Sequence, residues 1–192
     1  MIPRAEPSTD LKVAPGAPDA DAEALRRQIQ RFIRQFGLLA NDRTPCGKPL
    51  AVSHAHALMV LLEQQRAGRR PTQQDLGRAL GIDKSNVARL SSKMVAAGQL
   101  VQDRSSRDGR LRLLRLTDRG ARLAVSVERS SQARFREIIL GVCSHERRSV
   151  LSALLTLNES LARSTARQEA NRRPLRPVRP RRSGKSNPAR SS

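Results

Sequence analysis

Aromatic residues are nearly absent from this chain of 192 residues, which has three Phe, no Trp and no Tyr. Proteins that bind single-stranded nucleic acids or RNA loops stack the bases on aromatic side chains. The composition therefore argues against a single-strand or RNA-loop binder.

Cysteine and histidine are also scarce, with two and three residues respectively. The two cysteines, Cys46 and Cys143, lack the C-x-x-C spacing of zinc sites and cannot form a disulfide framework. His54 and His56 are two residues apart, so on a helix they point to different faces and do not form a metal site. We expect no cofactor and keep both histidines as candidates for lining a ligand pocket. The sequence shows no Ser/His/Asp order or phosphate-binding loop, so we expect no enzyme.

Acidic residues are few, with 17 Asp and Glu against 37 Lys and Arg, which gives a formal net charge of +20. So basic a chain is expected to bind polyanions, of which a nucleic acid is the first choice. No apolar stretch approaches the length of a membrane-spanning helix. The N-terminus lacks the apolar core of a secretory signal. We therefore expect a cytoplasmic, nucleoid-associated protein without a membrane partner.

Two short helices joined by a tight turn are predicted between Thr72 and residue 97. Thr72 with Asp75 can form a capping box at the first helix, which Gly81 can end in the left-handed conformation. Asp83 can cap the second helix. Its apolar stripe consists of Val87, Leu90 and Met94.

The opposite face of the second helix carries short side chains and cations, with no bulky apolar residue among them. These residues are Lys84, Ser85, Asn86, Ala88, Arg89, Ser92 and Lys93. Such a face suits a helix that enters the major groove of double-stranded DNA. We predict base-edge contacts from Ser85, Asn86 and Arg89. The predicted phosphate contacts are Lys84, Ser92 and Lys93.

A basic β-hairpin is predicted directly after these helices. Residues 100–102 begin one strand, residues 111–116 alternate leucine with arginine, and the loop 103–110 between them is polar. Arginines crowd its tip, which favours a DNA-contacting wing over a hairpin charged by chance. The predicted phosphate contacts here are Arg104, Arg107 and Arg112.

Helices on both sides of this lobe carry apolar stripes at helical spacing. They consist of Leu25, Ile29, Phe32, Phe36 and Leu39 on one side, and Val150, Leu154, Leu157 and Leu161 on the other. We expect helices beginning at Asp21 and Ser144, another beginning at Ser53, and a long one from Asp118 to about Leu140. These stripes exceed what a small winged-helix core covers, so we predict a dimerisation region. A monomeric bundle is the alternative.

Proline-rich and basic composition marks the two ends of the chain as disordered. From Asn171 to Ser192 there are eight cations and no acid. The predicted fold class is mainly α with a small β-hairpin wing: a winged helix-turn-helix lobe plus a helical dimerisation region. The predicted parts are an arm (1–20), a domain (21–165) and a basic tail (166–192). Within the domain, the lobe is about 51–117, and the dimerisation helices are about 21–40 and 118–165.

The stretch LGIDKSNVARLSSKMVAAGQLVQDRSSRDGRLRLLRLTDRG resembles the MarR family of bacterial winged-helix transcription regulators. The resemblance extends over roughly Leu25 to Arg163. The matching features are the recognition-helix pattern, the Gly98-Gln99-Leu100 step, the Asp108-x-Arg110 pair and the Leu116-Thr117-x-x-Gly120 motif. The chain departs from the family at Ser91-Ser92 and Met94.

The resemblance implies that Arg110 enters the minor groove and that Asp108 orients it. It also implies a pocket for a small anionic aromatic effector that changes the spacing of the recognition helices. We predict a homodimeric, sequence-specific regulator of double-stranded DNA, acting as a repressor. Its pseudo-palindromic operator should have half-sites roughly 34–36 Å apart.

Two other functions stay open. Cys46, with Arg43 and Lys48 nearby in a loop, is a candidate redox-sensing thiol, whereas Cys143 fits a small buried apolar group. The net charge alone would also suit a nonspecific packaging protein, although that function leaves the polar helix face unexplained.

Overall fold

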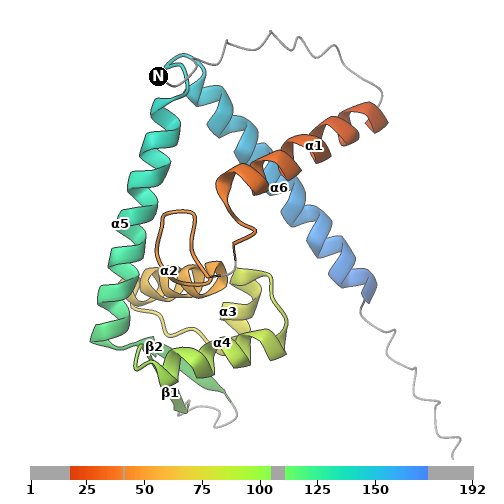
Figure 1. Ribbon diagram of the computed structural model, residues 1–192. Helices are drawn as coiled ribbons and strands as arrows, with labels where there is room; N and C mark the ends of the chain where they lie inside the picture. Colours follow the sequence, from red (N-terminus) through yellow and green to blue (C-terminus); the bar gives the residue numbers. More distant parts are fainter. Residues whose placement is uncertain (1–17, 41, 105–110, 173–192) are drawn as a thin grey trace, which may run out of the picture. The chain divides into compact units, whose positions relative to one another are not determined.

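The computed structural model describes residues 18–40, 42–104 and 111–172 (Figure 1). In these residues the elements are α1 (Pro18–Phe36), α2 (Val52–Arg66), α3 (Gln73–Leu80), α4 (Lys84–Ala96), β1 (Leu100–Arg104), β2 (Arg112–Leu116), α5 (Asp118–Leu140) and α6 (Arg147–Arg172). The predicted fold class, mainly α with a small hairpin, is confirmed. The chain divides into two units, residues 1–138 and 139–192.

Local hydrogen bonds set the ends of α3 and α4 as predicted. Thr72 and Asp75 form the capping box, in which the Asp75 amide donates to Thr72 Oγ1 over 3.2 Å and the Thr72 amide donates to Asp75 Oδ2 over 2.9 Å. Gly81 has a φ of 64° and ends α3 in the left-handed region that glycine tolerates. Asp83 caps α4, because its Oδ1 accepts the Asn86 amide over 2.9 Å.

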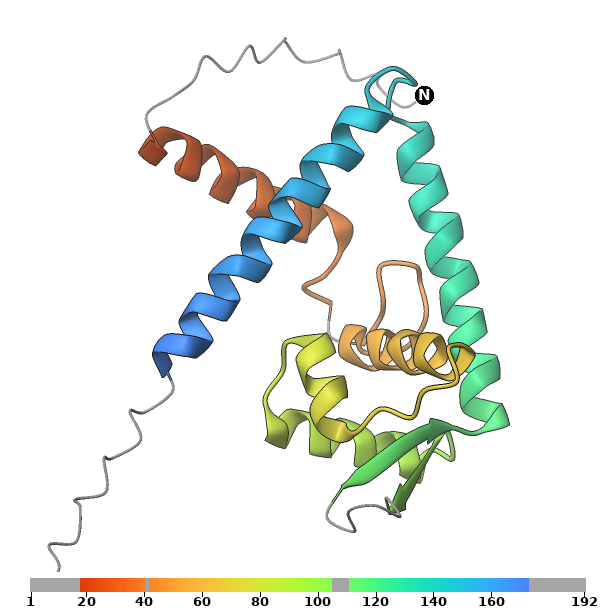
Figure 2. The ribbon, with the colours of Figure 1, turned by 180° about the vertical axis from the view of Figure 1, so that it is seen from behind.

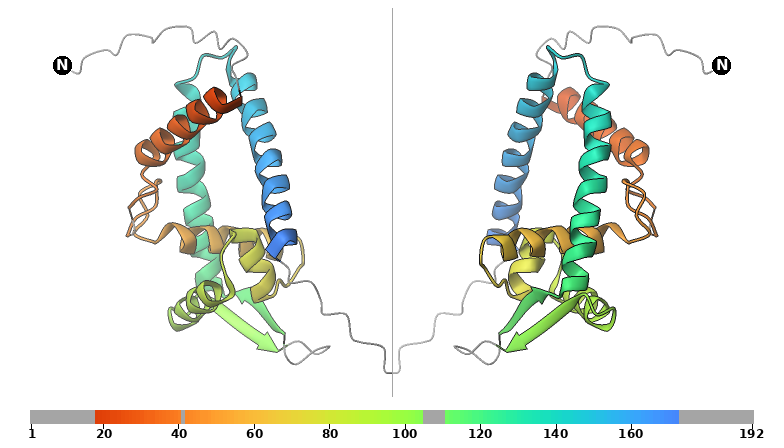
Figure 3. Two further views of the ribbon diagram at one scale, coloured as in Figure 1. Left: turned by 90° about the vertical axis from the view of Figure 1, so that its right-hand side faces the viewer. Right: turned by 90° about the vertical axis from the view of Figure 1, so that its left-hand side faces the viewer.

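The core of the first unit lies where α2, α3, α4 and the hairpin meet the first half of α5. Its largest fully buried side chains are Leu58, Leu61, Leu76, Val87, Met94, Leu114, Leu116 and Val127. Each such side chain contributes about 1.5–3 kcal/mol by leaving water. The first half of α5 crosses the C-terminal end of α2 (Figure 3), where Arg66 and Glu128 form a two-bonded ion pair of 2.7 and 2.9 Å. This core holds α4 at the surface of the lobe.

The hairpin is antiparallel, and its register runs from Leu100 opposite Leu116 to Arg104 opposite Arg112. It lies next to α4 (Figure 2). The first strand continues through Arg104, so residues 103 and 104, predicted to be loop, are in fact paired. The second strand begins at Arg112, one residue later than expected. The Leu114 amide donates to Pro71 O over 2.8 Å, which fastens the hairpin to the residues before α3.

A tight joint connects the end of α4 to the start of α5. The Thr117 amide donates to Gln99 O over 3.0 Å, and its hydroxyl donates to Gly98 O over 2.7 Å. The Gly120 amide then donates to Thr117 Oγ1 over 3.1 Å, so Thr117 caps α5 as predicted. A Cβ on Gly120 would lie 2.0 Å from Gln99 O. This approach is the physical reason for glycine in the Leu116-Thr117-x-x-Gly120 motif.

Three helix starts differ from the prediction. The helices α1 and α2 begin at Pro18 and Val52, ahead of the expected Asp21 and Ser53. The last helix begins at Arg147 rather than Ser144; the Arg147 Nε donates to Val142 O over 3.0 Å and so closes the turn before it.

The last helix also runs to Arg172, past the boundary predicted at residue 165. Residues 166–172 are Ala, Gln, Glu, Asn and Arg. Most of these are good helix formers, although they carry no apolar stripe. None of the helices in the described residues is long and apolar enough to cross a membrane.

Candidate nucleic-acid interface

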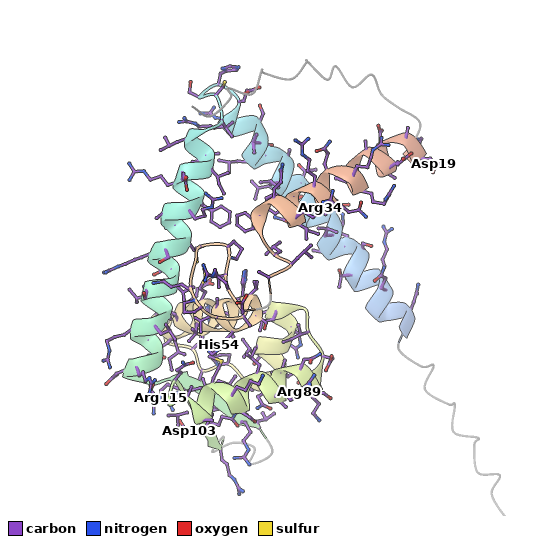
Figure 4. The ribbon with its side chains drawn as sticks, viewed as in Figure 1. Asp19, Arg34, His54, Arg89, Asp103 and Arg115 are labelled. Carbon is purple, nitrogen blue, oxygen red and sulfur yellow. The ribbon has the colours of Figure 1, made fainter. Side chains whose placement is uncertain are left out.

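The helix α4 has one buried face and one exposed face. Val87, Leu90 and Met94 are buried in the lobe, as predicted. The six predicted contact residues of this helix, Lys84, Ser85, Asn86, Arg89, Ser92 and Lys93, are all exposed. Figure 4 labels Arg89 on this helix. The arrangement leaves polar groups and cations free to meet a polyanion.

Three side chains at the start of α4 form a hydrogen-bonded chain. Asn86 Nδ2 donates to Asp83 Oδ2, and Arg89 Nη2 donates to Asn86 Oδ1. The Asn86 backbone amide, followed by its side chain, holds the pKa of Asp83 below its usual range. Asp83 therefore remains a carboxylate near neutral pH.

Small residues allow α3 and α4 to pack closely. A Cβ on Gly77 would lie 3.0 Å from Val87 Cγ2 and 3.2 Å from Ile82 O. Ser91, noted in the sequence only as a departure from the family, is fully buried, and within the described part of the chain its hydroxyl has no hydrogen-bond partner. The sequence did offer a signal for this position, because Ser91 lies four residues after Val87 and three before Met94, on the same side of the helix.

The two hairpin strands add cations beside α4. Arg104 and Arg112 face each other in the register, and both are exposed. Arg115 on β2, labelled in Figure 4, is also exposed and adds a further cation, in keeping with the alternation of leucine and arginine in the sequence. The predicted wing-tip residues Arg107, Asp108 and Arg110 lie outside the described residues.

Residues 49–111, which include α2, α3, α4 and β1, match the model of the MarR family. This part of the chain is therefore a MarR-family winged-helix lobe. A curated relative, the uncharacterized HTH-type transcriptional regulator YdgJ of Bacillus subtilis, is 27% identical over 90 residues, which are 47% of this chain and 55% of that protein. The chain thus spans about half the length of this relative.

Solved structures share the fold of this MarR-family domain. The S. aureus MepR–DNA complex has a TM-score of 0.53 at 17% identity and covers 74% of this chain and 94% of its own. The PcaV transcriptional regulator from Streptomyces coelicolor, in complex with its natural ligand, has a TM-score of 0.53 at 21% identity. This match covers 81% of this chain and 99% of PcaV.

The two histidines of α2 lie in different surroundings within the MarR-family domain. His54 is half-buried, with Nε2 2.7 Å from Gln99 Oε1, whereas His56 is exposed. A hollow of about 520 Å³ lies along α5 instead, and neither histidine lines it. Its lining residues are Ala121, Arg122, Val125, Ser126, Arg129 and Ser130. Lys48 Nζ donates to Ser126 Oγ over 2.9 Å, so a lysine lies beside the two arginines and two serines of this lining.

The two cysteines are free thiols in unlike places. Cys46 is half-buried, and its Sγ lies 3.1 Å from Thr44 Oγ1. Cys143 is exposed, so the prediction of a buried apolar group was wrong. It lies in the turn between α5 and α6, outside the core of the first unit. Among the described residues no cluster of His, Cys, Asp and Glu suits a metal ion.

Apolar side chains remain exposed on the helices outside the MarR-family lobe. In α1 no residue is buried. Phe36 lies 5.1 Å from Phe32 and 5.3 Å from Phe135 between ring centroids, yet Phe32 and Phe135 are each 50% exposed. The exposed apolar residues of α6 are Val150, Leu151, Leu154, Leu155 and Leu161.

Proposed function

We propose that this chain is a homodimeric, sequence-specific regulator of transcription that binds double-stranded DNA and acts as a repressor in the cytoplasm. The observation that carries the proposal is the orientation of α4. Its apolar face is packed in the lobe, so six polar and cationic residues of the opposite face are exposed. A helix placed in this way fits the width of the major groove. The MepR structure, which has the same fold, is a DNA complex.

In this proposal α4 reads bases while the hairpin holds the backbone. Ser85, Asn86 and Arg89 are the predicted base contacts, and Lys84, Ser92 and Lys93 contact phosphates. On the wing, Arg104, Arg107 and Arg112 attract phosphates. Arg110 enters the minor groove, and Asp108 orients it. Phosphate contacts set the position of the protein, and base contacts set its preference.

A second copy of the chain is the partner that we propose for the exposed apolar helices. The helix α1 has an apolar stripe without a buried residue, and α6 leaves five large apolar residues exposed. Burying each of them would contribute about 1.5–3 kcal/mol. A two-fold dimer presents two recognition helices and therefore predicts a pseudo-palindromic operator.

A small anionic effector is the regulator that we propose. PcaV, which shares the fold, was solved with its natural ligand. His56 is exposed and stays a candidate for lining the pocket, whereas one ring nitrogen of His54 is already engaged by Gln99. Bound effector would change the spacing of the two recognition helices and release the operator.

Selection of bound duplexes from a random pool tests this function. We expect a pseudo-palindrome with half-sites about one helical turn apart. Recovery of random sequence at every round would contradict the regulator and support a packaging protein, because phosphate contacts alone carry no sequence preference.

A further inference from the structure

Asp83 precedes the recognition helix, and both of its carboxylate oxygens are engaged by Asn86. Oδ1 accepts the backbone amide over 2.9 Å, and Oδ2 accepts the side-chain Nδ2. The remaining polar atom of the Asn86 side chain, Oδ1, accepts a hydrogen bond from Arg89 Nη2. The three residues are spaced at i, i+3 and i+6, so they follow one line along the exposed surface of α4.

The chemistry of the three groups fixes the direction of this chain. A carboxylate can only accept, so the amide must turn its NH₂ group toward Asp83. The amide oxygen is then left on the side of Arg89, whose guanidinium can only donate. One carboxylate therefore decides which end of the amide faces Arg89.

The negative charge of Asp83 interacts favourably with the dipole of α4 but is unfavourable for a helix that meets phosphates. Asp83 is exposed at the start of a helix that is proposed to meet phosphates, which a carboxylate repels. Helix capping alone does not require the charge, because serine and asparagine cap about as well as aspartate. A neutral cap of another shape would not orient the side chains of Asn86 and Arg89 in the same way.

We propose that Asp83 is a positioning residue for base recognition, which acts through Asn86 to fix the direction in which Arg89 presents its guanidinium to DNA. The inference rests on the proposed function. Asn86 then links Asp83 to Arg89, while its second N–H and the second lone pair of its oxygen are left for the base contact proposed above. Arg89 has five N–H donors and gives one to Asn86, so enough donors remain for a two-bonded contact with guanine.

The substitution D83N tests the role of the carboxylate while keeping a capping residue. Its new amide can still accept the backbone hydrogen bond, but it places a donor opposite Asn86 Nδ2. The Asn86 amide must then turn over and direct its own donors at Arg89, which releases the guanidinium. D83S, which also caps but lacks the second oxygen, removes the hydrogen bond with Nδ2 in a different way.

The control D75N removes the same charge from the capping box of α3, which has no link to Arg89. We expect the ratio of affinities for selected and scrambled duplexes to fall about five- to tenfold in D83N and D83S, the lower end of what a two-bonded arginine contact is worth. D75N should change that ratio by less than about twofold. The ratio is the right readout, because loss of any acid raises the affinity for all DNA.

A double mutant separates positioning from a merely structural role. If Asp83 acts through Arg89, then D83N should not lower the ratio further in a chain that already carries R89A. The inference alone, and not the proposed function, is overturned if D83N and D83S keep the sequence preference of the wild type. It is also overturned if the effects of D83N and R89A on the ratio add in full. A wild-type protein without any sequence preference overturns the proposed function as well.

Discussion

Arg89 is the single side chain whose loss we expect to lower operator preference most. R89A should abolish most of the discrimination and leave folding unchanged, because the side chain is exposed and, among the described residues, its hydrogen bond goes to Asn86. A two-bonded base contact is worth about 1–3 kcal/mol. Fluorescence anisotropy with selected and scrambled duplexes measures the loss. R136A, on the exposed side of α5, is the control, and an unchanged preference in R89A would refute the assignment.

Gly120 is the residue at which we expect the smallest change to do the most harm to folding. G120A places a methyl group 2.0 Å from Gln99 O, and a backbone atom cannot move aside as a side chain can. We expect a loss of about 1–3 kcal/mol or more in the free energy of unfolding, as for other overpacked sites. Urea denaturation measures it, with Q132A on the same helix as the control. Equal stability of the two variants would show that the joint can open without cost.

At the scale of elements, the cap of α3 should make the lobe sensitive to acid. Hydrogen bonds from Thr72, first from its backbone and then from its hydroxyl, hold the pKa of Asp75 below its ordinary value of 3.8. A carboxyl with a lowered pKa in the folded state stabilises it above the unfolded value, and this contribution is lost as the pH falls through the folded value. The difference in unfolding free energy between the wild type and D75N should be largest above about pH 5 and shrink toward about pH 2. Denaturation midpoints across this range measure the difference; one that stays constant with pH contradicts the prediction.

Elements defined by local signals could be predicted from the sequence. Thr72, Gly81 and Asp83 end or begin helices through contacts within three or four residues, so their spacing was enough. The end of α6 was misjudged because an exposed helix needs no apolar stripe. The wing was expected to have a longer loop because strand pairing of Asp103 and Arg104 depends on partners beyond the turn.

Site features that depend on tertiary contacts could not be predicted. The His54–Gln99 hydrogen bond joins residues 45 positions apart, and nothing near either residue indicates the other. The exposure of Cys143 follows from the turn it occupies. The outward face of α4 was predictable because one helix determines it.

At the scale of the whole molecule, the exposed helices should make the chain a dimer. Light scattering at micromolar concentration is expected to give twice the 21.2 kDa of one chain. L154D should yield a folded monomer, because it places a charge on the apolar side of α6, whereas S152D on another side of that helix should remain dimeric. A monomeric wild type would contradict the proposal.

The basic tail should add affinity without adding preference. Removing residues 173–192 leaves α6 whole and takes away seven Lys and Arg. Phosphate contacts carry no sequence information, so affinity for every duplex should fall by a similar factor. The slope of log affinity against log salt should flatten by about 0.9 for each phosphate that the shortened chain leaves unneutralised. Anisotropy at several salt concentrations measures this, with removal of residues 1–17 as the control. Identical slopes would leave the tail without a role on DNA. A changed ratio of affinities for selected and scrambled duplexes would mean that the tail reads sequence.

The division of α4 into a packed face and an exposed face bears on how such a protein diverges. The helix is held in the lobe by Val87, Leu90 and Met94. Its exposed residues can therefore be replaced together while the fold of the lobe is kept. New target sequences are then reachable by few mutations, each nearly neutral for folding. Asp83 is the exception, because it caps the helix and, in our proposal, aims Arg89. Sets of exposed α4 residues that retain Asp83 and Asn86 should therefore be the easier ones to move into a related winged-helix protein.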